Sequence, residues 1–170
     1  NYNPDYPLIR DRLAKANVID KGITVLNMYD YLSGDTKETH MLANPKLISI
    51  AEAGYTVEKI GNKSSYRYFD NGLLIKSKSF DPISGKLKSI DYFNSQLNKT
   101  AREEYDYQGI KRRVTYFDHV VGQKKQELYF DEAGRCYLTK WFTLGDKTSS
   151  LEKIYWFDEN KRLKQMFAND

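Results

Sequence analysis

The chain has 170 residues, of which 40% are hydrophobic and 29% charged, a length that suits one ordinary domain or a small one with an extension. Its mean hydropathy of −0.72 is polar, yet 14% of the residues are aromatic, so we expect a folded protein rather than a disordered one. No apolar run approaches the roughly 20 residues that cross a bilayer, and the first residues lack the order of a signal peptide. These features exclude a transmembrane protein and predict a soluble, cytoplasmic one. The first residue, Asn1 rather than Met, favours a piece of a longer protein.

The basic charge lies in the second part of the chain. Residues 1–60 hold seven Lys and Arg against eight Asp and Glu, whereas residues 61–170 hold twenty against fifteen. A partner that carries phosphates or carboxylates is therefore conceivable there, although Lys and Asp that solvate a sheet explain the same balance. The single cysteine, Cys136, can form no internal disulfide, so the fold does not depend on an oxidising compartment.

Residues 1–46 are predicted to be a connector that differs from the rest of the chain. Pro7 suits the first position of a helix, and the apolar spacing after it predicts a short helix that ends near Asn17. Residues 23–26 are a candidate for a brief strand, and a turn or half-helix comes next, before Gly34. Pro45 argues against a long regular element. The segment therefore either packs on the later part of the chain or belongs to the edge of a neighbouring domain.

Residues 47–170 are predicted to form an antiparallel β-meander. Two strands are expected around the turn from Glu52 to Gly54, and each later strand ends in an aromatic residue, mostly followed by Asp or Asn. Successive aromatics are 11 to 15 residues apart, which fits one strand and one turn each time. The sequence thus predicts a mainly β fold, an extended meander of about 8–10 strands with a short helix and strand before it. The aromatics are Phe69, Phe80, Phe93, Tyr105, Phe117, Phe130, Phe142 and Phe157.

The turns between these strands share one chemistry. Most begin with Asp and end with Gly, as from Asp131 to Gly134. An Asp side chain accepts hydrogen bonds from backbone N–H groups two residues on, and Gly supplies the positive φ that such a turn needs. In the last turn Asn160 or Lys161 takes the place of Gly. Turns this short join neighbouring antiparallel strands and disfavour a parallel solenoid.

The meander is predicted to be extended or curved, with aromatic ladders on both faces. Doublets such as Tyr116-Phe117 put a large ring on each face near the strand ends. An open meander also leaves two unpaired edges. We expect the N-terminal helix to cover the edge near residues 47–60 and another copy of the chain to cover the edge from Arg162 to Phe167, so homo-oligomerisation is predicted.

The sequence offers little for nucleophilic or metal chemistry. His40 and His119 are the two histidines, and neither has a Cys or a second His at ligand spacing, so no metal site is expected. Cys136 follows Arg135, which would favour its thiolate, but a nucleophile also needs a paired His. A packed strand cysteine is the simpler interpretation.

Carboxylates and glycine motifs give no further candidate. Glu103 and Glu104 are neighbours in a strand, so they point to opposite faces and share no site. The Asp residues of the turns lack the staggered order of a calcium loop. No phosphate-binding glycine motif is present, so we expect no cofactor and no catalytic residue in this chain.

Surface recognition remains the main functional possibility. Cations lie among aromatic residues in the second part of the chain, a combination that holds sugars by stacking and phosphates by charge. Single-stranded nucleic acid uses similar groups but is not favoured by any motif, and cations lying over an aromatic ladder explain the pattern structurally. The candidate residues for binding an acceptor or partner are Lys111, Arg112, Arg113, Tyr116, Lys124 and Trp141.

Several stretches of the chain are typical of one group of bacterial enzymes. The most telling are NMYDYL and YFDEAGRCYLTKWF, with tandem YFDNGLL, YDYQG and YWFDENKRL units. Together they resemble the β-meander domain inserted in glycosyltransferases of the two-Rossmann (GT-B) type. That group includes the wall teichoic acid α-glycosyltransferases, which are poly(glycerol-phosphate) α-glucosyltransferases, and the accessory-Sec glycosyltransferases that modify serine-rich adhesins.

The resemblance implies an extended sheet that projects from the N-terminal Rossmann domain of a retaining hexosyltransferase, with residues 1–35 as its connector. It implies a role in oligomerisation or in receiving the acceptor, an anionic glycopolymer or a protein, at the inner face of the membrane. Catalysis in that group uses a pair of Glu and a basic residue in the C-terminal Rossmann domain, and none of these maps onto this chain. The alternatives are a free-standing aromatic-Asp-Gly repeat module of the MORN or YD kind and an enzyme built around Cys136 or His119.

Overall fold

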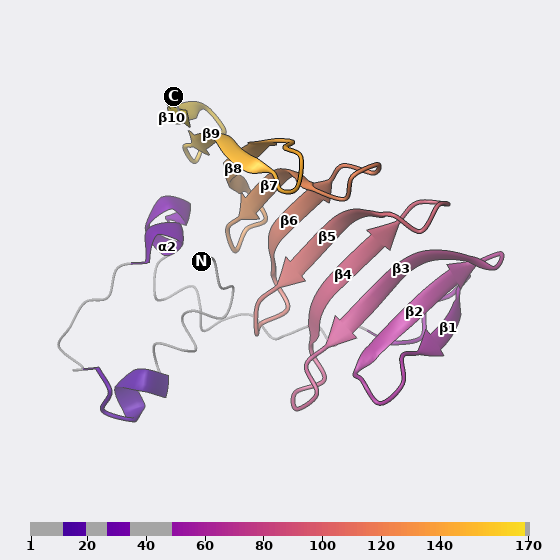
Figure 1. The fold of residues 1–170 in the computed structure, drawn as a ribbon. Helices are drawn as coiled ribbons and strands as arrows, with labels where there is room; N and C mark the ends of the chain where they lie inside the picture. The colour runs from indigo at the N-terminus through magenta and orange to yellow at the C-terminus, as the bar shows by residue number, and fades with distance from the viewer. Residues whose placement is uncertain (1–11, 20–26, 35–48, 169–170) are drawn as a thin grey trace.

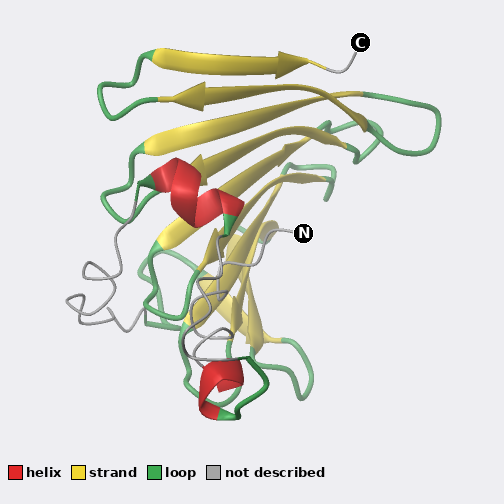
Figure 2. Ribbon diagram, turned by 90° about the vertical axis from the view of Figure 1, so that its left-hand side faces the viewer, coloured by secondary structure: helices red, strands yellow, loops and turns green. Residues whose placement is uncertain are grey.

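The computed structural model describes residues 12–19, 27–34 and 49–168. Its main body is one open antiparallel sheet in which ten strands follow each other in sequence order, so that β1 and β10 form the two edges. The sheet twists and curves along its length (Figure 1 and Figure 2). The predicted meander is thereby confirmed. The strands are β1 (Thr56–Lys59), β2 (Ser65–Asp70), β3 (Leu73–Phe80), β4 (Leu87–Phe93), β5 (Lys99–Tyr105), β6 (Lys111–Phe117), β7 (Lys124–Phe130), β8 (Cys136–Thr143), β9 (Ser150–Phe157) and β10 (Leu163–Ala168).

The turns have the predicted chemistry. In the turn after β5, the Oδ1 atom of Asp106 accepts hydrogen bonds from the backbone N–H groups of Gln108 (2.9 Å) and Ile110 (3.0 Å), and Gly109 has a φ of 83°. In the last turn Lys161, with a φ of 62°, takes the place of Gly. Leu97 does the same after β4 with a φ of 64°.

A register shift accompanies every pairing from β2–β3 to β9–β10. Most of these shifts lie at the aromatic residue that precedes the turn, as between Tyr116 and Phe117. A bulge bends its strand and increases the local right-handed twist. Because the same irregularity recurs from hairpin to hairpin, the sheet curves instead of lying flat.

The hairpin predicted around Glu52 to Gly54 has only its second strand. Residues 49–52 form no strand, and β1 begins at Thr56. The segment before the turn is instead held by side chains of the sheet, since the Tyr68 hydroxyl donates to the carbonyl oxygen of Ile50 at 2.7 Å. Its hydrogen bonds therefore go to side chains rather than to a strand ladder.

Two short helical segments precede the sheet among the described residues. In the first, residues 12–15 are helical and are followed by a turn at 16–17, close to the predicted end. The second, α2 (Met28–Ser33), begins after Asn27, whose side chain accepts from the Tyr29 N–H at 2.8 Å, and ends at Gly34 with a φ of 76°. The strand predicted at 23–26, residue Pro45 and the predicted boundary after residue 46 lie outside the described residues.

Helix α2 packs on a face of the sheet rather than along an edge. The Tyr29 ring stacks on the Tyr129 ring of β7 with 5.0 Å between centroids, and the Trp156 indole N–H of β9 donates to the Leu32 carbonyl oxygen at 3.2 Å. Figure 1 shows both helices far from β1. The expectation that the N-terminal helix covers the edge near residues 47–60 is therefore wrong for its described part, residues 12–15, and α2 packs instead on buried rings of β7–β9.

The apolar core is split into two small clusters. One groups Phe80, Leu87 and Ile90 under partly buried tyrosines of neighbouring strands. The other groups Tyr129, Tyr137 and Leu138 beneath α2. With so little apolar depth, cross-strand contacts and ion pairs supply much of the cohesion of the sheet.

Candidate functional site

The six predicted contact residues lie in the central and C-terminal part of the sheet, on β6, β7 and β8, but they do not form one cluster. The strand register places Tyr116 opposite Gln126 and Gln126 opposite Trp141. Arg113 pairs with Tyr129 and points to the other face of the same strands. The charged candidates and the aromatic candidates therefore have to be considered separately.

The two arginines are engaged in internal ion pairs. Arg112 is only 8% exposed, and its Nε and Nη2 atoms lie 2.8 Å from Asp106 and 3.0 Å from Glu132. Arg113 contacts Glu104 through Nε, and although its burial disfavours the cation, this ion pair raises the pKa of Arg113. Both guanidinium groups hold neighbouring hairpins together.

The lysines follow a recurring arrangement. Lys111 lies 3.3 Å from Glu103, with its ammonium 5.4 Å from the centroid of the Phe130 ring. Lys124 lies 2.9 Å from Glu127 and 5.9 Å from the centroid of the Phe142 ring. In each case a cation at the start of one strand lies over a ring at or next to the end of the following strand, and the cation is also paired with a carboxylate. Both lysines thus have partners within the sheet, and their contact with an acceptor stays a prediction.

The Glu103 carboxylate, which faces Lys111, is further held by two tyrosines. The hydroxyls of Tyr92 and Tyr105 donate to its Oε2 atom at 3.2 and 2.6 Å. Burial, with the neighbouring carboxylate, raises the pKa of Tyr92 to about 12. Glu104 lies on the opposite face with Arg113, as the strand alternation predicts, so the two adjacent carboxylates share no site.

One face of β6–β8 lies under α2, and we call the face that carries Arg113, Glu127, Tyr129 and Lys140 the covered face. The Tyr129 hydroxyl donates to Glu127 at 2.7 Å, and the Lys140 ammonium donates to the Tyr29 hydroxyl at 2.8 Å. Burial alone would raise the pKa of Glu127, but hydrogen bonds from Lys124 and Tyr129 hold it below its usual range. Every side chain that defines this face has a charged or aromatic partner.

The opposite face of the same three strands carries Tyr116, Gln126 and Trp141 side by side, a set that we call the open row. The side chain of Tyr116 is 43% exposed and that of Trp141 is 37% exposed. Among the described residues, none of the three makes a side-chain hydrogen bond or ion pair. Sequence reasoning found the two rings but missed Gln126, because its place between them depends on the register of β7 with both neighbours.

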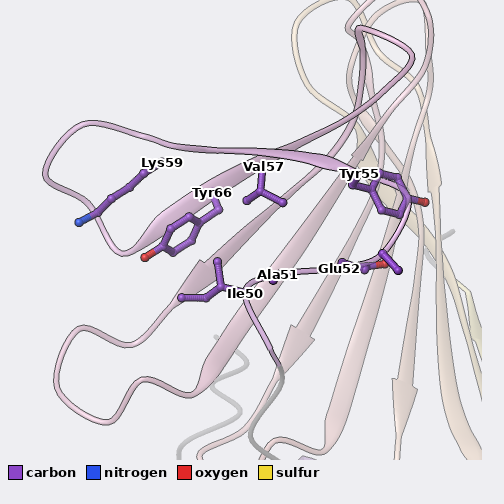
Figure 3. Close-up of a pocket in the computed structure, with 8 residues that line it drawn as sticks. Ile50, Ala51, Glu52, Tyr55, Val57, Lys59 and Tyr66 are labelled. Atoms are coloured by element: carbon purple, nitrogen blue, oxygen red, sulfur yellow. The ribbon is translucent and has the colours of Figure 1, made fainter.

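A hollow of about 590 Å³ lies at the other end of the sheet, between residues 50–53 and strands β1 and β2 (Figure 3). Figure 3 shows Ile50 facing Tyr66, with Lys59 near the far end. Glu52 lines the hollow, but its carboxylate oxygens lie 2.6 Å from Lys76 and Lys78 of β3. The Glu52 carboxylate is therefore neutralised by these two lysines, which limits what it could contribute to binding a ligand in the hollow.

Neither a metal cluster nor an activated cysteine is found among the described residues. No group of three His, Cys, Asp or Glu side chains in that part of the chain could hold a metal ion. Burial raises the pKa of the Cys136 thiol, which is the opposite of what a nucleophile needs, and Arg135 is paired with Asp131 at 2.7 Å instead of facing the sulfur. His119 lies in the turn after β6, and His40 lies outside the described residues. No helix described is long and apolar enough to cross a bilayer.

Comparisons with known proteins give matches in structure only. No known protein family profile matches the chain, and no curated protein matches its sequence. The crystal structure of a variant of S. aureus TarM in complex with Fondaparinux, alpha-GlcNAc-glycerol and UDP aligns over 99% of the chain with a TM-score of 0.72 and 18% identity. The chain shares its fold with a part of TarM.

Two further structures extend this likeness. The Glycosylation Associate Protein (Gap123) complex from Streptococcus agalactiae aligns over 99% of the chain, with a TM-score of 0.68 and 18% identity. The GtfA/B complex bound to UDP and GlcNAc aligns over 99% of the chain, with a TM-score of 0.62 and 16% identity. The chain covers 33%, 31% and 38% of these three chains, so it spans about a third of the structures it matches. The resemblance to a domain of bacterial glycosyltransferases is confirmed at the level of the fold.

Proposed function

We propose that the chain is a non-catalytic domain of a bacterial cell-wall or adhesin glycosyltransferase, where it assembles the enzyme and receives the acceptor. The likeness to about a third of TarM and of the GtfA/B complex supports a domain within a longer transferase. This likeness favours a domain of a glycosyltransferase over a free-standing repeat module. The proposed parent is a retaining hexosyltransferase whose sugar-nucleotide chemistry takes place outside this chain, in the cytoplasm at the inner face of the membrane.

The observation that carries the assembly role is the edge strand β10. Within the part of the chain that the structure describes, it pairs only with β9, and all six of its residues are exposed. Leu163, Met166 and Phe167 are 53%, 54% and 46% exposed. An edge that presents unpaired backbone groups together with apolar side chains is a template for another strand. Pairing with a second copy of the chain would provide hydrogen-bond partners for the backbone groups and bury the apolar side chains.

The acceptor role rests on the aromatic residues of the sheet rather than on its cations. An anionic glycopolymer such as a teichoic acid, or a protein acceptor, was expected to meet Arg112, Arg113 and Lys124. These cations already form ion pairs with carboxylates of the sheet, which makes the open row the better supported contact surface. The TarM variant, whose fold this chain shares in part, was crystallised with the carbohydrate ligands Fondaparinux and alpha-GlcNAc-glycerol, which is in keeping with a carbohydrate ligand for the parent transferase.

Sedimentation velocity of the purified chain over a range of concentrations tests the assembly role. We expect self-association that the double substitution Met166→Lys with Phe167→Lys abolishes, because charged residues on an edge strand oppose strand addition. Ile83→Lys is the matched control, since Ile83 lies in a turn and is 96% exposed. A strict monomer at high concentration would contradict assembly by this chain.

A further inference from the structure

The open row has the geometry of a binding strip. Tyr116, Gln126 and Trp141 lie directly opposite each other on β6, β7 and β8, with the amide between the two rings. Neighbouring strands are 4.7–4.9 Å apart, so the Cα atoms of the two ring-bearing residues are separated by about 9.5 Å. That separation is about twice the repeat of a linear saccharide, so it suits three linked rings, the outer two each lying against one aromatic side chain and the middle one lying over Gln126.

The polar atoms of the open row are available for a ligand. The Tyr116 hydroxyl, the Gln126 amide and the Trp141 indole N–H have no hydrogen-bond partner among the described residues. The polar side chains that define the covered face of the same strands are all paired, as with Tyr129 and Glu127. The row is therefore distinguished by unused donors and acceptors beside exposed rings.

The charge around the open row is balanced. Lys153 of β9 lies next to Trp141 in the same register, and its ammonium forms an ion pair of 2.8 Å with Glu152. Arg113 and Lys124 are bound to carboxylates elsewhere in the sheet. An uncharged partner matches this surface better than a polyanion does, because these cations are already compensated.

Uncharged rings with many hydroxyls are the ligands that this chemistry fits. Aromatic side chains present an apolar face and a polar edge, and a saccharide presents C–H faces and hydroxyls in the complementary order. We propose that Tyr116, Gln126 and Trp141 bind an uncharged stretch of saccharide chain, with a sugar ring stacked on each aromatic ring and the amide bonding the hydroxyls between them. This assignment rests on the acceptor half of the proposed function and names its ligand class.

The test is isothermal titration of the full chain with chitotetraose and with maltotetraose, two uncharged linear tetrasaccharides. We expect at least one of them to bind, and Trp141→Ala and Tyr116→Ala each to weaken that binding by about tenfold or more, as for central aromatic contacts. Gln126→Ala should weaken it less, because it leaves both rings in place. Tyr31→Ala is the matched control, since Tyr31 of α2 is 63% exposed and lies outside the row.

The outcomes separate this proposal from its rivals. Binding that persists in high salt supports stacking on an uncharged ligand, whereas binding restricted to poly(glycerol phosphate) and lost in high salt overturns it in favour of charge recognition. Binding of neither tetrasaccharide overturns the proposal. Self-association that Trp141→Ala abolishes also overturns it, because the row would then be a contact between copies. The titrations with saccharides do not affect the assembly test at β10, which depends on Met166 and Phe167.

Discussion

The two faces of strands β6–β8 differ in what their side chains do. The covered face joins Arg113, Glu127 and Tyr129 in a paired network beneath α2, with Tyr129 only 1% exposed. The open row, on the same strands, leaves Tyr116 and Trp141 exposed without a polar partner among the described residues. The same backbone thus carries a stabilising face and a face whose aromatic residues are not explained by packing.

Strand alternation is what keeps these two tasks apart. Side chains at successive positions of β7 point to opposite faces, so Gln126 belongs to the open row and Glu127 to the covered face. A substitution in the open row can therefore change ligand binding without altering the ion pairs and hydrogen bonds of the covered face. The difference between the faces is measurable as a difference in unfolding free energy.

The largest expected effect is at the centre of the covered face. Tyr129→Ala should lower the free energy of unfolding by about 3–5 kcal/mol, because it removes a buried ring that stacks on Tyr29 and leaves a cavity. Urea denaturation followed by circular dichroism measures it. Tyr129→Phe is the control and should cost about 1.5–3 kcal/mol, the worth of a hydroxyl bond to the ionised Glu127 carboxylate. A loss below about 1 kcal/mol for the alanine variant would erase the contrast between the faces.

The next effect is the acid sensitivity of Glu127. Its pKa is lowered in the folded state, so its contribution is complete above the unfolded value and is lost as the pH falls through the lowered pKa. Glu127→Gln should cost about 2 kcal/mol at neutral pH, from lost hydrogen bonds to charged partners, and should flatten the decline in stability below about pH 5. Urea titrations at a series of pH values test this. An unchanged acid slope would show that the fold does not lower the pKa of this carboxylate.

Removing the contact of helix α2 with the covered face should have a smaller effect on the free energy of unfolding. Tyr29→Ala takes away the ring that stacks on Tyr129 and accepts from Lys140, and we expect a loss of about 1–2 kcal/mol. Met28→Ala is the control, because Met28 is 53% exposed on the same helix. Equal losses in the two variants would mean that α2 is not anchored through Tyr29.

The smallest expected effect is in the open row. Trp141→Ala and Tyr116→Ala should each lower the free energy of unfolding by less than about 1 kcal/mol, the range of an ordinary cross-strand pair. The same urea experiment applies. A loss comparable with that of Tyr129→Ala would make these rings part of the core and remove the reason to assign them a ligand.

The local parts of this fold could be predicted from sequence. An Asp that bonds backbone N–H groups within four residues and a Gly with positive φ act inside one turn, so the hairpins after β5 and β7 follow from their own residues. The opposite placement of Glu103 and Glu104 follows from alternation in the same way. These features need no knowledge of distant segments.

The remaining parts depend on register and on distant contacts. Whether Arg112 is free or bound to Asp106 and Glu132 depends on which hairpins lie side by side. The place of Gln126 in the open row depends on bulges that shift the pairing of β7 with both neighbours. The contact of Tyr29 with Tyr129 joins residues far apart in the sequence, and no local pattern specifies it.

The fluorescence of Trp141 tests the central claim most directly. The chain has two tryptophans, and Trp156→Phe leaves Trp141 as the only one. An open row predicts emission typical of a water-exposed indole that acrylamide quenches readily, and a shift to shorter wavelength with reduced quenching once a tetrasaccharide is added. Emission that is already shielded in the free chain, or that stays unchanged with both chitotetraose and maltotetraose, would contradict the assignment of this row to ligand binding.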